Sequence, residues 1–171
     1  MAAVLKIEDF NLLDDGECEA RIVAAKRMLG DRLCILGHHY QRNEVFRHAH
    51  FSGDSLKLSQ LAAKTKADFI VFCGVHFMAE VADIVTGGER TVILPDLAAG
   101  CSMADMANLA KVRKCWDELS TVLDPDQMVT PVTYINSAAD LKAFCGRHGG
   151  IVCTSSNARA VLEWAFARRE K

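Results

Sequence analysis

The stretch that decides the fold is Leu33-Cys-Ile-Leu-Gly-His-His-Tyr40. Its first four residues are apolar, and this short run predicts a buried strand at Leu33–Leu36. Three side chains with acid–base or hydrogen-bonding chemistry, His38, His39 and Tyr40, come directly after the strand. In parallel α/β sheets, ligands bind beyond the carboxyl ends of the strands. The stretch therefore predicts a parallel sheet with a site at the end of this strand.

Short apolar runs alternate with amphipathic stretches on both sides of this strand. The amphipathic stretches have apolar residues at helical spacing, and the apolar runs indicate strands. Helices are expected at Glu17–Leu29, Asp54–Thr65, Met78–Val85 and Asp105–Leu119, and strands at Phe69–Cys73 and Thr91–Leu94. Gly30 is expected to stop the first helix, and Ser52-Gly-Asp54 to cap the second. This alternation predicts an α/β/α domain with a parallel sheet, over residues 1–123.

The pattern starts again after Asp124-Pro-Asp126, a predicted linker. Strands are expected at Met128–Ile135 and Ile151–Cys153, and helices at Ala138–Cys145 and Asn157–Ala167. Ile70-Val-Phe-Cys73 and Ile151-Val-Cys153 each end a strand in cysteine, which indicates a weak internal repeat. Residues 124–171 are therefore expected to be the start of a second three-layer α/β/α domain, truncated before it is complete. A naturally small appended subdomain is the alternative.

Composition excludes several classes of function. The net charge is −2 and the isoelectric point is about 6.3, so no basic surface for nucleic acid or an anionic membrane is expected. The longest apolar runs are too short to span a bilayer. Residues 1–15 lack a basic segment followed by an apolar one, so they do not resemble a secretory signal. A cytoplasmic protein is the expectation.

Seven cysteines are present, and their odd number and irregular spacing argue against a secreted disulfide framework. No CxxC pair occurs, which disfavours a structural zinc ribbon. Cys101 lies in a loop of small residues that leads into a predicted helix, and a helix N-terminus favours the reactive thiolate form. Five others are expected to serve packing in strands and helices: Cys34, Cys73, Cys115, Cys145 and Cys153.

His38 and Tyr40 form the first candidate site. Successive side chains of an extended chain diverge, so these two share a side while His39 points elsewhere. A tyrosine can move a proton at a reacting oxygen, and a histidine can hold a carboxylate or phosphate. The alternative is a capping cluster that hydrogen-bonds to the backbone.

Two turns are suited to anions. Ser52-Gly-Asp-Ser55 and Thr154-Ser-Ser-Asn157 each open a helix, where free N–H groups and the helix dipole favour phosphate or carboxylate. The alternative is that these residues serve only as N-caps. Tyr134 and Asn136 share a side at the end of a predicted strand and could face the same cleft between the domains.

Four segments resemble the quinolinate synthase family: Leu36-Gly-His-His-Tyr-Gln41, Gly53-Asp-Ser55, Phe72-Cys-Gly-Val-His-Phe-Met-Ala-Glu80 and Pro95-Asp-Leu-Ala-Ala-Gly-Cys-Ser-Met-Ala-Asp105. The resemblance implies three pseudo-symmetric α/β/α domains around a [4Fe–4S] cluster that acts as a Lewis acid. It also implies a transferase that condenses iminoaspartate with dihydroxyacetone phosphate to quinolinate, the pyridine precursor of NAD. A functional link to L-aspartate oxidase is a further implication.

The same resemblance implies roles for individual residues. Cys101 corresponds to a cluster ligand, and Tyr40 to a catalytic tyrosine that moves protons. The substrate-binding positions correspond to His38, Ser55, Tyr134, Asn136 and Ser155. The family's other cluster cysteines correspond to positions beyond Lys171. Two alternatives remain: an inactive truncated fragment, and a metal-free phosphate-binding α/β module that uses Ser55 and Ser155.

Overall fold

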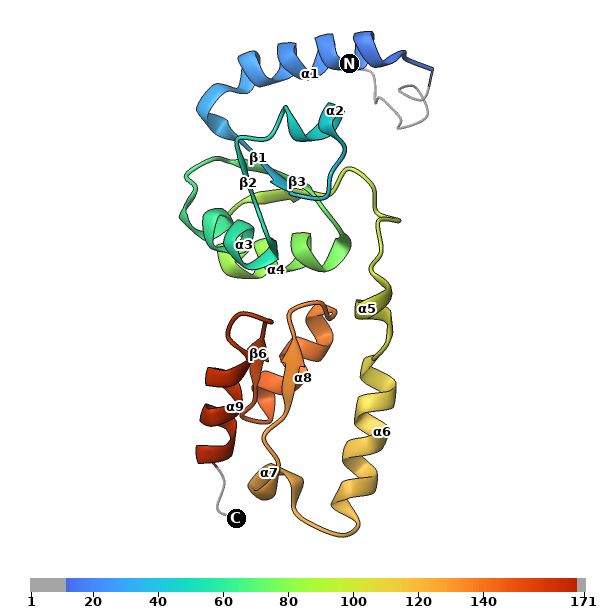
Figure 1. Cartoon of the computed structure of the whole chain (residues 1–171), viewed down its shortest axis with the longest axis vertical. Coiled ribbons are helices and arrows are strands. Elements are labelled where there is room, and N and C mark those ends of the chain that lie inside the picture. Colours follow the sequence, from blue (N-terminus) through green and yellow to red (C-terminus); the bar gives the residue numbers. More distant parts are fainter. Residues whose placement is uncertain (1–11, 169–171) are drawn as a thin grey trace.

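Two parallel sheets organise residues 12–168, the part of the chain that the computed structural model describes (Figure 1). The first sheet has the strand order β2-β1-β3-β4, and the second has the order β5-β6. The strands of the two sheets are β1 (Leu33–His38), β2 (Phe51–Gly53), β3 (Phe69–Cys73), β4 (Thr91–Ile93), β5 (Val132–Tyr134) and β6 (Ile151–Cys153). Residues 1–11, which include most of the segment considered for a secretory signal, and residues 169–171 lie outside the described part.

Helices cover both faces of the first sheet (Figure 1). The helices are α1 (Asp15–Leu29), the 3-10 turn η2 (Gly30–Arg32), α2 (Asn43–Phe46), α3 (Ser55–Lys64), α4 (His76–Thr86), α5 (Ser102–Asp105), α6 (Leu109–Ser120), α7 (Pro125–Met128), α8 (Ala139–Arg147) and α9 (Ala158–Ala167). Helices α3 and α4 lie on one face, and α1 and α2 lie on the other. This arrangement confirms the predicted three-layer α/β/α fold. Within residues 12–168, no helix is long and apolar enough to cross a bilayer.

The core lies between the first sheet and helices α3 and α4. Leu36 of β1, together with Ile70 and Phe72 of β3, is fully buried there, because alternate residues of a strand face the same side. Leu58 of α3 packs in the same cluster. Ile135, which follows β5, also belongs to this cluster and is 7% exposed. The two sheets are therefore joined through one apolar core.

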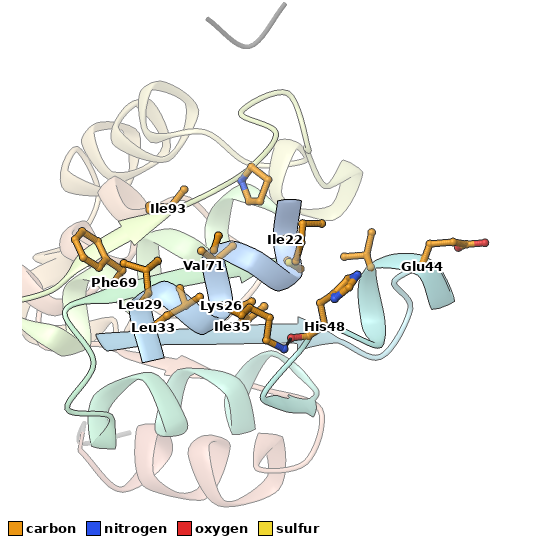
Figure 2. A pocket seen from close by; sticks show the side chains of 14 residues that line it. Ile22, Lys26, Leu29, Leu33, Ile35, Glu44, His48, Phe69, Val71 and Ile93 are labelled. Carbon is orange, nitrogen blue, oxygen red and sulfur yellow. Dashed lines mark hydrogen bonds between the residues drawn. The ribbon is translucent and has the colours of Figure 1, made fainter. Parts of the chain in front are cut away.

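The opposite face of the first sheet is only loosely covered (Figure 2). Helix α1 buries none of its residues, and a cavity of about 610 Å³ lies between it and the sheet. The lining is mostly apolar and includes Ile22 and Leu29 of α1 and Ile35, Val71 and Ile93 of the strands. Lys26 Nζ donates a hydrogen bond of 2.7 Å to the backbone oxygen of His48 at the rim.

Four sequence expectations about elements are wrong. The edge strand β2 was expected to be only a capping segment; Phe51 of this strand is exposed, so no apolar run marks it. The helix expected from Asp105 begins only at Leu109, as α6, because Asn108 caps it by accepting a hydrogen bond of 3.0 Å from the Lys111 N–H; the short helix α5 ends at Asp105. The predicted linker contains α7, and β5 is shorter than expected because it begins only at Val132.

Helix α6 associates with the second sheet, although the sequence assigned it to a first domain ending at residue 123. The ring of Trp116 in α6 meets the ring of Phe144 in α8 edge-on, with centroids 5.3 Å apart. Figure 1 shows α6 alongside the second unit. The boundary at residue 123 stays a prediction.

Candidate functional site

His38 ends β1 and stacks with Tyr40. The two ring centroids are 4.0 Å apart, so the structure brings together the pair that strand alternation placed on one side. His38 is 6% exposed, and its Nδ1 has no hydrogen-bond partner among the described residues. His39 is also close, at 4.2 Å, because a turn follows His38 and the expected divergence of neighbouring side chains does not apply. The backbone oxygen of Gly53 lies 3.3 Å from Nδ1 of His39.

The environment of this pair favours the neutral forms of both side chains. Burial lowers the pKa of His38, and His39 acts in the same direction, whereas Asp54 acts in the opposite one. Burial raises the pKa of Tyr40, and Cys101 adds to that effect. Tyr40 therefore remains protonated near neutral pH and can act as a proton donor.

Cys101 connects the two sheets. It follows β4 through the loop that starts at Pro95, and it packs against the shared apolar core. Asn136, 35 residues further along the chain, directs its side-chain Nδ2 to the Cys101 Sγ at 3.8 Å. The helix after Cys101, α5, has only four residues, so it supplies a much weaker dipole than the sequence pattern led us to expect.

Tyr134 and Ser155 meet at the carboxyl ends of β5 and β6. The Tyr134 hydroxyl oxygen lies 2.5 Å from the Ser155 Oγ. Parallel strands bring these residues together, because Tyr134 pairs in register with Cys153, two residues before Ser155. Asn136 lies in the bend after β5 rather than in the strand. The two hydroxyls form a pair that can donate to an anionic oxygen.

Capping of α3 is carried out by Asp54, and Ser55 is the first residue of the helix. The Asp54 carboxylate accepts a hydrogen bond of 2.8 Å from the Lys57 N–H. In the second turn, Asn157 Oδ1 accepts hydrogen bonds from the N–H of Thr154 at 2.7 Å and from its hydroxyl at 3.0 Å. Asp54 is therefore the side-chain cap of α3, whereas Asn157, at the N-cap position of α9, makes no side-chain capping hydrogen bond and instead binds back to Thr154.

The other cysteines differ in accessibility. Cys34 and Cys145 are buried, as expected, and burial raises the pKa of each. Cys73 and Cys153 are half-buried. Cys115 was expected to serve packing, but it is exposed on α6. The apolar character of cysteine did not reveal this exposure.

Sequence reasoning missed the role of Glu80 in linking the two units. Glu80 of α4 accepts a hydrogen bond of 3.0 Å from the backbone N–H of Ala139, the first residue of α8. Glu80 ends the Phe72–Glu80 motif, but that position in the sequence does not indicate a structural role. A contact between residues 59 positions apart cannot be read from local periodicity.

Comparison with known proteins agrees with this geometry. The sequence matches the family described as Quinolinate synthetase A protein over residues 20–171. The chain is 56% identical over 180 residues to the quinolinate synthase of Rhodopirellula baltica, covering 99% of this chain and 46% of that relative. It is 58% identical over 166 residues to that of Corynebacterium glutamicum, covering 96% of this chain and 42% of the relative. It is 62% identical over 150 residues to that of Nocardioides sp., covering 87% of this chain and 38% of the relative.

The chain spans less than half the length of these curated relatives. The match nevertheless includes every residue of the candidate site, from His38 to Ser155, because the family alignment runs from residue 20 to the last residue of the sequence. This chain belongs to the quinolinate synthase family.

Proposed function

We propose that this chain carries part of the active site of a quinolinate synthase in NAD biosynthesis. The reaction condenses iminoaspartate with dihydroxyacetone phosphate and releases phosphate and water. The observation that supports this most directly is the position of the predicted site residues around the contact between the two sheets: Cys101 touches Asn136, Tyr40 stacks on His38, and Tyr134 touches Ser155.

The polar side chains divide into proton-transferring and anion-binding groups. Tyr40 is protonated near neutral pH and is the proposed proton donor to a substrate oxygen that leaves as water. His38 is largely neutral there because burial lowers its pKa, and its imidazole ring is proposed to hydrogen-bond to substrate. Ser55, at the start of the ten-residue helix α3, is proposed to bind a phosphate or carboxylate oxygen.

The second unit supplies the other anion contacts. Tyr134 and Ser155 present two hydroxyl groups side by side, and Asn136 adds an amide that can both donate and accept. Substrates with carboxylate and phosphate groups need several such donors, placed so that the carbon atoms that form bonds are held together. The proposed role of these three residues is therefore to bind and orient.

The residues described do not by themselves hold the [4Fe–4S] cluster that the family resemblance implies. Such a cluster needs several cysteine thiolates at one point. Within residues 12–168, no three His, Cys, Asp or Glu side chains gather as a metal site. We propose Cys101 as one ligand, with the other thiolates supplied from outside the described residues. When bound, the cluster would supply a Lewis acid for substrate oxygens.

Binding and turnover test this function separately. Dihydroxyacetone phosphate should bind the 171-residue chain in calorimetry, and Ser55→Ala and Ser155→Ala should each weaken that binding. In a quinolinate synthase of the relatives' length that contains this chain, Tyr40→Phe should reduce quinolinate formation by about 10²–10⁴-fold while substrate still binds. Absence of binding to the wild-type chain, or turnover by Tyr40→Phe near the wild-type rate, would contradict the proposal.

A further inference from the structure

The loop that carries Asn136 is held in place from the first unit. This loop, residues 134–139, connects β5 to α8. Helix α8 has no side-chain cap of its own, because Ala138 stands at the cap position. Glu80 of α4 supplies the acceptor instead, through its Oε2 and the Ala139 N–H at 3.0 Å. A carboxylate at a helix N-terminus also interacts favourably with the helix dipole.

Lys142 fixes the same loop from the other side. It lies in the first turn of α8, and its Nζ donates a hydrogen bond to the backbone oxygen of Ser137. The ammonium group lies over the ring of Phe77 in α4, 5.6 Å from the centroid. Burial lowers the pKa of Lys142, and the Glu80 carboxylate opposes that shift.

The loop is also braced internally. Ser137 is 5% exposed, and its hydroxyl donates a hydrogen bond of 2.7 Å to the backbone oxygen of Tyr134. Ile135 inserts into the core of the first unit. An apolar contact of this kind is strong but non-directional, whereas hydrogen bonds to Ala139 and Ser137 specify one orientation. On this rigid loop, Asn136 reaches Cys101 at 3.8 Å.

We propose that Glu80 and Lys142 are positioning residues that dock the 134–139 loop on α4, so that Tyr134 and Asn136 stand correctly relative to Cys101 and Tyr40. The effect on catalysis rests on the proposed function, whereas the docking of the loop does not depend on the reaction. The Glu80 side chain is 25% exposed, so its hydrogen bond is partly shielded from water. His76 lies 3.7 Å from the other carboxylate oxygen and forms the remaining side of the cluster.

Hydrogen exchange of the 171-residue chain tests the docking. In Glu80→Ala, the Ala139 amide should exchange about tenfold faster or more, because it loses its acceptor. Glu80→Gln keeps an oxygen acceptor and should restore most of the protection. Asp83→Ala removes an exposed acid from the same helix and should leave the exchange unchanged. Equal exchange in wild type and Glu80→Ala would overturn the inference.

Cross-linking tests the relative position of the site residues. Asn136→Cys places a second thiol opposite Cys101. Mild oxidation should then form a disulfide between Cys101 and the introduced thiol, which peptide mapping identifies. Adding Glu80→Ala should slow this bond by about tenfold, whereas adding Asp83→Ala should not. An unchanged rate in the Glu80→Ala background would contradict a positioning role, even if the variant were less stable.

Turnover links the docking to the proposed function. In a quinolinate synthase of the relatives' length that contains this chain, Glu80→Ala should lower kcat by about tenfold or more, and Glu80→Gln should recover most of it. If exchange and cross-linking change but kcat does not, the catalytic part of the inference is wrong. If the wild-type protein makes no quinolinate, the proposed function fails, while the exchange and cross-linking results still decide whether Glu80 docks the loop.

Discussion

Asp54 and Ser55 are neighbours at the start of α3, but they have different structural roles. Asp54 accepts the 2.8 Å hydrogen bond from the Lys57 N–H, whereas Ser55 is already inside the helix. The cap and the proposed anion contact therefore belong to separate residues. This separation allows stability and binding to be tested independently.

Asp54→Ala should lower the free energy of unfolding by about 1 kcal/mol, because it leaves a helix N–H without its acceptor. Ser55→Ala should cost less than about 0.5 kcal/mol, as is usual for a partly exposed side chain without a capping role. Urea denaturation of the two variants and the wild type measures both values. A larger loss for Ser55→Ala than for Asp54→Ala would show that the assignment of the cap is wrong.

Protonation of His38 should destabilise the protein at acidic pH. Burial holds its pKa below the ordinary value, so the unfolded chain takes up the proton first as the pH falls. The contribution to stability is complete above the unfolded pKa of about 6.5 and is lost as the pH drops below it. His50, whose pKa is also lowered by burial and by Lys26, should act in the same direction.

Thermal melting between pH 7.5 and 5 checks this expectation. The melting temperature of the wild type should fall as the pH decreases, and that of His38→Gln should fall less steeply. Part of the dependence should persist in the variant because His50 is retained. Parallel profiles for the two proteins would mean that His38 does not contribute.

At the scale of the elements, two glycines near the end of α8 differ in the space available for a side chain. Gly146 lies inside α8, and a Cβ there would meet no atom within 4 Å. Gly150 precedes β6, and a Cβ there would lie 2.0 Å from the backbone oxygen of Pro131. The close approach lets Ile151 pair with β5, since the Ile151 N–H donates to the same oxygen at 3.1 Å.

Gly146→Ala should raise the free energy of unfolding by about 0.5–1 kcal/mol, because alanine favours the helix more than glycine does. Gly150→Ala should lower it by more than about 1 kcal/mol, because two backbone segments must separate. Chemical denaturation of the pair provides the comparison, with each variant serving as the control for the other. Stabilisation by Gly150→Ala would refute the close approach.

At the scale of the whole molecule, the two sheets are coupled through Ile135. This residue belongs to the second unit but is buried in the core of the first. Helices α4 and α8 are in contact at the same junction. We therefore expect the described part of the chain to unfold in one cooperative transition.

Ile135→Ala should lower the free energy of unfolding by about 2–5 kcal/mol and make the transition broader, because it removes buried apolar volume at the junction. Ile84→Ala, at a position that is 54% exposed on α4, should cost less than about 1 kcal/mol. Urea unfolding followed by tryptophan fluorescence reports the second unit, and far-ultraviolet circular dichroism reports the whole chain. Coincident, unshifted transitions in Ile135→Ala would contradict the coupling.

The sequence by itself determined the layered α/β/α fold, the order of most elements and the identity of the family. Apolar runs such as Phe69–Cys73 predicted their strands because burial on both faces leaves a local pattern. The same pattern was missing for β2, whose Phe51 is exposed, and for the start of α6, which the side chain of Asn108 caps.

Only the tertiary structure decided which residues meet. The stacking of His38 on Tyr40 follows from neighbouring positions in the chain and was predictable from them. The contacts between Cys101 and Asn136 and between Glu80 and Ala139 join residues 35 and 59 positions apart. Periodicity describes which side of its own element a residue faces, but it carries no information about how two units dock. That arrangement depends on the burial of Ile135 and on the hydrogen bond that Glu80 accepts from Ala139, which exist only once the chain has folded.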